Sequence, residues 1–197
     1  TVDGSITSSL DRRTAGLMEL PQLPDLDEKN ITSAQLELSD GTVRQLTSAV
    51  ETRETEVETE TGETDENGEP IYETTTETEE ITLWSLDGQP LPEGTVGLED
   101  WLYDLSTLYL DSCSAFKADQ EELSACGMDG ASLLTVSLTS GETFTLAIGG
   151  QTEDGSYVYA ALEAPAPGCD LFLISADKAR TLSDLNYESL SADEEAE

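Results

Sequence analysis

The sequence predicts an α+β fold, in which an antiparallel sheet of hairpins carries two or three helices on one side and a protruding acidic β-hairpin arm. Three observations favour it. Turn dipeptides, Asp40-Gly41, Asn67-Gly68 and Asp87-Gly88 among them, separate segments of alternating polarity, as is typical of hairpins. The order along the chain is strands, helix, strands, helix. The length of 197 residues fits about one domain.

The N-terminal part of the chain is expected to be helical. Asp3 or Ser5 is a candidate N-cap for a helix over residues 6–20, and Pro21 ends it. Residues 21–30 contain two prolines and several acids, which indicates a linker. From Ile31 the period changes to two, so strands are expected on both sides of the turn at residues 39–42.

Residues 50–82 alternate glutamate with threonine. If Asn67-Gly68 forms a two-residue turn, threonines and Val57 share one face of the hairpin and glutamates oppose glutamates on the other. These facing pairs are Glu56 with Glu79 and Glu58 with Glu77. Threonine suits a strand, whereas facing glutamates cost stability. The pattern predicts a long arm with one hydrated face; because a lone hairpin is marginal, an irregular loop is the alternative.

The rest of the chain alternates between the two periodicities. Residues 97–110 have an apolar stripe at helical spacing, so Trp101 and its leucines are expected in the core. A short helical turn is expected near residues 118–123, and a last helix from Ser175 to Leu185. The remaining expected strands cover residues 81–86, 133–138, 143–148, 157–162 and 171–175.

These elements divide the chain into three parts. Residues 1–30 are an N-terminal helix and linker. Residues 31–187 form the α+β domain, with the glutamate–threonine hairpin inserted at about 50–82, and residues 188–197 are a solvated acidic tail. No leader or membrane span is visible, so we expect any targeting or anchoring segment to lie outside this sequence.

The charge excludes several classes of function. The net charge of −35 repels phosphate backbones and anionic membrane surfaces. The absence of histidine removes histidine-based catalysis and nearly all catalytic zinc sites. The three candidate lysines for a serine–lysine pair, Lys29, Lys117 and Lys178, lie in no recognisable motif, and no phosphate-binding loop is present. The sequence therefore predicts a protein that is not an enzyme and has no cofactor.

Calcium is the sharpest chemical alternative. Residues 63–68 resemble the first half of an EF-hand loop, but Thr74, at the twelfth position of that loop, stands where a bidentate glutamate is required. Weak cation binding by facing glutamates is the other hypothesis. Its candidate ligands are Glu56, Glu58, Glu77 and Glu79. A plain solvated acidic face is favoured over both, so the metal ligands stay unknown.

The cysteines are odd in number. Cys113 and Cys126 are close enough in sequence to form a bridge that leaves Cys169 free, but three pairings are possible, and three buried free thiols explain the sequence equally well.

Several short motifs carry a family resemblance. They are LSACGMD (residues 123–129), TVSLTSGETFTLAIG (135–149), YVYAALE (157–163), LFLIS (171–175) and, upstream, ITSAQLELSDGTV (31–43). Together they resemble the uncharacterised DUF4340 family over residues 31–185. Because that family often occurs as tandem copies, the resemblance implies an alternative for residues 1–30, the tail of a preceding repeat. Cys126 departs from the pattern, because an aromatic residue is usual there, and the glutamate–threonine segment looks like an insertion.

The resemblance implies a bacterial, membrane-anchored, extracytoplasmic protein, often encoded beside ABC-transporter components of the gliding-motility type. It implies no catalytic residues. We therefore expect a non-enzymatic accessory domain of an ABC-type transport or envelope system, acting through a protein partner, with no nucleic acid and with the membrane met only through an anchor outside this sequence. The alternative is a cell-surface structural or adhesive spacer, stiffened by weak calcium binding. The partner's identity and the oligomeric state stay open.

Overall fold

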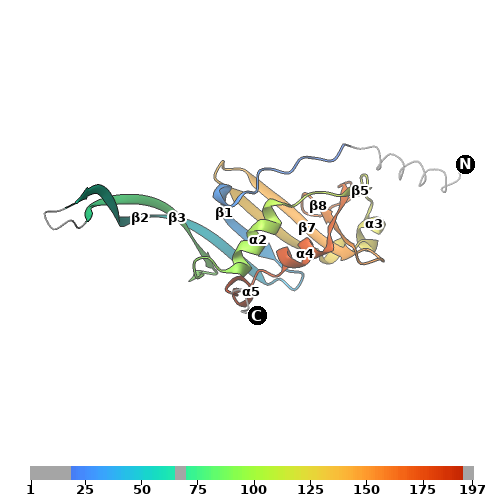
Figure 1. Cartoon of the computed structure of the whole chain (residues 1–197). Coiled ribbons are helices and arrows are strands. Elements are labelled where there is room, and N and C mark those ends of the chain that lie inside the picture. Colours follow the sequence, from blue (N-terminus) through green and yellow to red (C-terminus); the bar gives the residue numbers. More distant parts are fainter. Residues whose placement is uncertain (1–18, 65–69, 193–197) are drawn as a thin grey trace, which may run out of the picture.

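The structure, a computed structural model, describes residues 19–64 and 70–192 (Figure 1). Within them a nine-stranded antiparallel sheet runs in the order β4-β3-β2-β1-β6-β7-β8-β9-β5, and four α-helices pack around it. The strands are β1 (Ile31–Glu37), β2 (Val43–Thr64), β3 (Pro70–Leu86), β4 (Gln89–Pro90), β5 (Ser112–Ala115), β6 (Ser132–Leu138), β7 (Thr143–Gln151), β8 (Tyr157–Ala161) and β9 (Leu171–Ser175). The expected α+β class with an antiparallel sheet is confirmed.

The helices are short. They are α2 (Val96–Ser106), α3 (Gln120–Ala125), α4 (Ala176–Ser183) and α5 (Tyr187–Leu190), with two 3₁₀ turns, η1 (Glu28–Asn30) and η2 (Met128–Gly130). Asp119 caps α3 through a capping box with Glu122. Helix α2 ends four residues before its expected end at Leu110. Leu108 and Leu110 are nevertheless buried, so the apolar stripe continues into an irregular segment that leads to β5.

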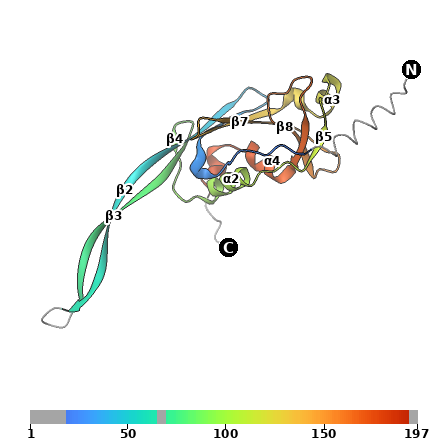
Figure 2. The same cartoon turned by 90° about the horizontal axis from the view of Figure 1, so that it is seen from above.

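Helices α2 and α4 cover one face of the sheet (Figure 2), and α5 adds Leu190 to the same core. They bury Trp101, Leu105 and Leu182 against the inward residues of the strands, such as Leu36 and Leu146. Alternate residues along each strand point to this side, as in β6, where Leu134, Val136 and Leu138 are buried.

Helix α3 belongs to the opposite face, which corrects the expectation that all helices share one side. Ala147 and Leu171 pack with Leu123 of α3, whereas their strand neighbours Ile148 and Phe172 belong to the main core. Consecutive residues of a strand point to opposite faces. The end of the sheet formed by β7, β8 and β9 is therefore apolar on both sides, and it needs cover on both.

Both ends of the described chain pack more closely than the sequence suggests. The expected helix over residues 6–20 lies mostly outside the described residues, and Glu19 and Leu20 are not helical. In the linker, Leu26 is buried and Leu23 packs on the core. The expected tail begins too early at residue 188, because α5 places Leu190 in the core at 1% exposure.

Helix α5 is held against the start of α2. The Thr95 hydroxyl donates to the Leu190 carbonyl at 2.8 Å, and the Gly97 amide donates to the Ala192 carbonyl at 3.1 Å. The approach needs glycine at position 97, because a Cβ there would lie 1.9 Å from the Ser189 carbonyl oxygen.

No helix among the described residues is both long enough and apolar enough to cross a membrane.

Candidate binding surface

Strands β2 and β3 extend beyond the rest of the sheet as a two-stranded ladder (Figure 1). Strand β1 pairs with β2 only as far as Thr47, and β4 pairs with β3 only at Ser85 and Leu86. We call the part of this ladder with described side chains, residues 50–58 of β2 and 72–82 of β3, the distal ladder. At its base, Ile81 and Thr82 line a hollow together with Leu98 of α2. Beyond them no helix among the described residues covers the ladder, and the side chains of residues 51–56 and 72–80 are exposed.

The register of the distal ladder differs from the one that a turn at Asn67-Gly68 predicts. Glu56 lies opposite Thr76, not Glu79, and Glu58 lies opposite Thr74, not Glu77. The observed register is shifted by three residues from the expected one. Because side chains alternate between the two faces of a strand, an odd shift moves each β3 side chain to the other face of the ladder relative to β2. Each of these glutamates thus faces a threonine, which removes the direct repulsion of the expected pairs.

The observed register comes from the base of the ladder. Leu46 lies opposite Leu86, and both are buried in the main core. From that pair the ladder runs without a shift to Glu60 opposite Tyr72, and an irregularity follows before Thr64. Core burial at the base therefore outweighs the turn signal at residues 67–68, which lie outside the described residues.

The four candidate metal ligands are not brought together. Glu56 and Glu58 lie on one face of the ladder, and Glu77 and Glu79 lie on the other. No group of three or more acidic, cysteine or histidine side chains among the described residues is arranged to hold a metal ion. The hypothesis of cation binding between facing glutamates is therefore wrong in its geometry.

One ion pair ties the ladder to the domain. Arg53 donates to both carboxylate oxygens of Glu93, at 2.8 and 3.3 Å, and Glu93 lies in the loop between β4 and α2. The hydrogen bond from Arg53, with its charge, lowers the pKa of the Glu93 carboxyl, and Glu93 in turn raises the pKa of Arg53. This ion pair, which we call the Arg53–Glu93 clamp, was not predicted, although Arg53 is the only basic residue between positions 50 and 82.

A cavity lies on the helix side of the sheet. A cavity of about 520 Å³ between α2, α4 and α5 is lined by Asp100, Asp104, Asp184 and the Trp101 indole. The Trp101 Nε1 atom is buried and has no hydrogen-bond partner among the described residues. Arg180, at the same rim, is bound to Asp177 at 2.9 Å. The cavity gathers carboxylates, but not in an arrangement that holds a metal.

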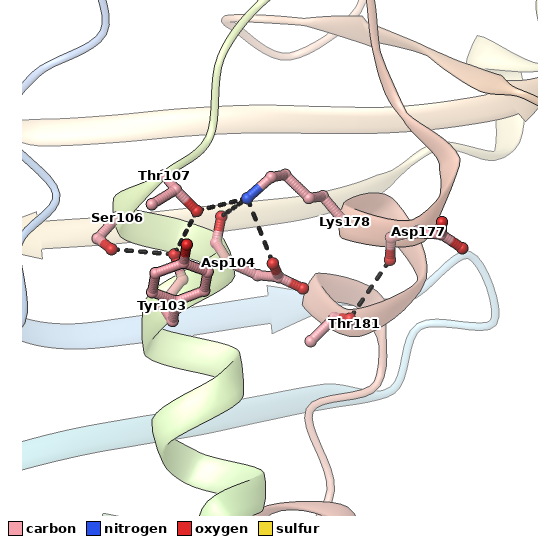
Figure 3. A network of polar contacts seen from close by, with 7 residues as sticks. All are labelled: Tyr103, Asp104, Ser106, Thr107, Asp177, Lys178 and Thr181. Atoms are coloured by element: carbon pink, nitrogen blue, oxygen red, sulfur yellow. Dashed lines mark hydrogen bonds and ion pairs between the residues drawn. The ribbon is translucent and has the colours of Figure 1, made fainter.

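Lys178, one of the candidate catalytic lysines, pairs with Asp104 of this cavity and has a structural role (Figure 3). Its ammonium donates to the Asp104 carboxylate at 3.2 Å and to the Thr107 hydroxyl. Thr107 in turn donates to the Tyr103 carbonyl at 2.6 Å. A cation at the C-terminal end of α2 is stabilised by the helix dipole, so Lys178 joins α2 to α4.

The three cysteines are free thiols. Burial, followed by the charge of a nearby acid, raises the pKa of Cys113 (beside Asp170) and of Cys126 (beside Glu122). A raised pKa lowers the thiolate fraction at neutral pH, which disfavours a nucleophilic role for either residue.

Comparison with known proteins adds no relative: no protein-family model, curated protein or solved structure matches the chain.

Proposed function

We propose that this chain is a non-enzymatic, extracytoplasmic binding domain of a membrane-anchored bacterial protein, accessory to an ABC-type transport or envelope system. In this proposal residues 31–187 form a DUF4340-like domain, and residues 50–82 are a protruding acidic arm that contacts a partner protein. The observation that carries the proposal is the distal ladder, which is exposed on both faces and extends past the core-forming strands.

The charge distribution supports this role for the arm. Residues 50–82 contain thirteen acids and one arginine, and the described side chains of that arginine and of Glu93 are already paired with each other. A surface of this kind attracts a basic protein surface and repels acidic ones, so it contributes association rate and partner choice. The strands gain no core by extending there, so the extension favours a role outside the domain's own stability.

The test is crosslinking of the full-length anchored protein in its native membrane, followed by identification of the proteins that co-purify. An arm variant replaces eight glutamates with glutamine: Glu51, Glu54, Glu56, Glu58, Glu73, Glu77, Glu79 and Glu80. A matched body variant neutralises eight exposed acids elsewhere: Glu19, Glu37, Glu99, Asp100, Glu121, Glu153, Glu163 and Glu188.

We expect transporter or envelope subunits to co-purify with the wild type and the body variant, and to be lost with the arm variant. Equal recovery with both variants would remove the arm from the interface. Recovery of wall material or self-contacts alone would overturn the accessory role and favour a surface spacer.

A further inference from the structure

The outer edge of β2 is open along the distal ladder. Its last paired residue toward β1 is Thr47, opposite Ser33. The next residue, Ser48, contacts the start of β1 only through its side chain: its hydroxyl donates to the Ile31 and Thr32 carbonyls, at 3.0 and 3.2 Å. From Ala49 onward β2 has β3 on one side and, among the described residues, no strand on the other. Such an edge presents unpaired backbone N–H and C=O groups at alternate residues.

The side chains along this edge follow a regular pattern. Glu54, Glu56 and Glu58 alternate along one face, about 7 Å apart. Val50 shares their face at the base of the ladder and is 68% exposed. Toward β3 each of the three glutamates has a threonine opposite it, so no cation pairs with them there. No ion pair of the described residues includes them.

Charge decides which strand this edge accepts. A second copy of the chain carries the same net charge of −35 and would place glutamates beside glutamates. A strand with lysine or arginine at alternate positions places one cation beside each glutamate. If this strand extends to the base of the ladder and has an aliphatic residue at the position beside Val50, the two apolar side chains also pack together.

We propose that the outer edge of β2, from Ala49 to Glu58, is a docking site for an extended segment of a partner protein with basic residues at alternate positions. The segment adds a strand next to β2, so backbone hydrogen bonds hold it and the glutamate pairs select it. This inference rests on the proposed function, because it specifies how the acidic arm contacts its partner.

The probe is a fluorescent nine-residue peptide with lysine at its first, third and fifth positions, valine at its ninth, and mainly threonine between them. Binding to the whole chain is measured by fluorescence anisotropy at low salt, since exposed charge pairs are screened at high salt. Two control peptides carry N-methyl groups on one or the other alternate set of backbone nitrogens. Each control peptide keeps the charge of the probe and lacks the backbone N–H donors along one of its two edges.

Two triple variants of the protein complete the design. One changes Glu54, Glu56 and Glu58 to glutamine, and the other changes Glu73, Glu77 and Glu79, which lie on the other face and on β3. We expect the first variant to weaken binding roughly tenfold and the second to change it little. We also expect only one of the two N-methylated peptides to lose affinity, and circular dichroism to show both variants folded.

Equal loss with both triple variants, or equal binding of all three peptides, would overturn strand addition. It would leave the proposed function in place, because a basic ligand would still bind the arm through charge alone. A homodimer that protects residues 49–58 from hydrogen exchange would also overturn the inference, since a second copy would then occupy the edge. Loss of partner crosslinks in the membrane experiment, by contrast, tests the proposed function itself.

Discussion

Leu46 lies directly opposite Leu86 at the base of the ladder that β2 and β3 form, and both side chains are buried. This pair fixes which residues meet along the exposed ladder beyond it. Because the register continues without a shift, Glu56 faces Thr76 and Val57 faces Thr75. A buried apolar contact thus determines the arrangement of charges on a surface that has no core of its own.

Disulfide trapping tests that register. In a background without the three native cysteines, we expect Glu56→Cys/Thr76→Cys or the adjacent Val57→Cys/Thr75→Cys to form a disulfide readily. Opposed Cα atoms in an antiparallel ladder are about 4.5–5.5 Å apart, within the range of a disulfide. Both cysteine pairs are made because opposed residues alternate between hydrogen-bonded pairs, with Cα atoms about 5.5 Å apart, and non-hydrogen-bonded pairs, about 4.5 Å apart. Oxidation is followed by mass spectrometry.

The matched control is Glu56→Cys/Glu79→Cys, the pair expected from a turn at Asn67-Gly68. These residues lie on opposite faces of the ladder, so we expect no bridge. Closure of this pair alone would show that the ladder takes the other register.

Lys178→Met tests the link between α2 and α4. The Lys178 side chain is 17% exposed and its ammonium binds Asp104 and Thr107, so its removal is expected to cost about 1 kcal/mol of the free energy of unfolding. The control is Arg180→Met, because the Arg180–Asp177 pair is exposed and should have no measurable effect on urea unfolding. An equal effect of both substitutions would contradict a specific role for Lys178.

Gly97→Ala tests the docking of α5. A methyl group there meets the Ser189 carbonyl oxygen, so α5 must move, and we expect a loss of about 1–3 kcal/mol in unfolding free energy. Trp101 fluorescence reports the disturbance nearby. Gly130→Ala is the control, because the nearest atom to its added Cβ, the Ser39 Cβ, is 3.9 Å away. Unchanged stability of the Gly97 variant would show that α5 is not held closely.

The Arg53–Glu93 clamp is expected to respond to acid. Because Arg53 lowers the pKa of Glu93, the clamp is formed above the ordinary carboxyl pKa and is lost as the pH falls through the lowered value. In Arg53→Gln the Glu93 midpoint should rise, as measured by carbon NMR of the carboxyl group. Asp154 is the control: its pKa is lowered chiefly by the Thr152 side chain, so its midpoint should stay unchanged.

Local patterns predicted most of the sheet. The turns at Asp40-Gly41 and Asp87-Gly88 are where the dipeptides place them, and Asp87 and Gly88 both have the positive φ of a hairpin turn. Period-two runs found β6, β7, β8 and β9 to within a few residues. These signals succeed because backbone conformation and one-sided burial act over a few neighbouring residues.

The features that were missed depend on distant contacts. The sequence of strand β5 has little apolar pattern, and the strand forms by pairing with β9, where Cys113 lies opposite Phe172. Helix α5 has only four residues, and its burial requires Gly97 on α2. The expected pairs of facing glutamates were wrong for the same reason, because the positions of Glu77 and Glu79 relative to β2 depend on the buried pair at residues 46 and 86.

The two-stranded extension gives the molecule two unequal stabilities. The body unfolds only when its shared core is lost, whereas the pairs beyond Val50 and Thr82 hold few apolar contacts and open locally at small cost. A protease is therefore expected to cut the distal ladder while the body remains folded, and Glu51 and Ile81, which lie opposite each other, mark where such trimming would stop. In a cell this would separate the lifetime of the arm from the lifetime of the domain that carries it.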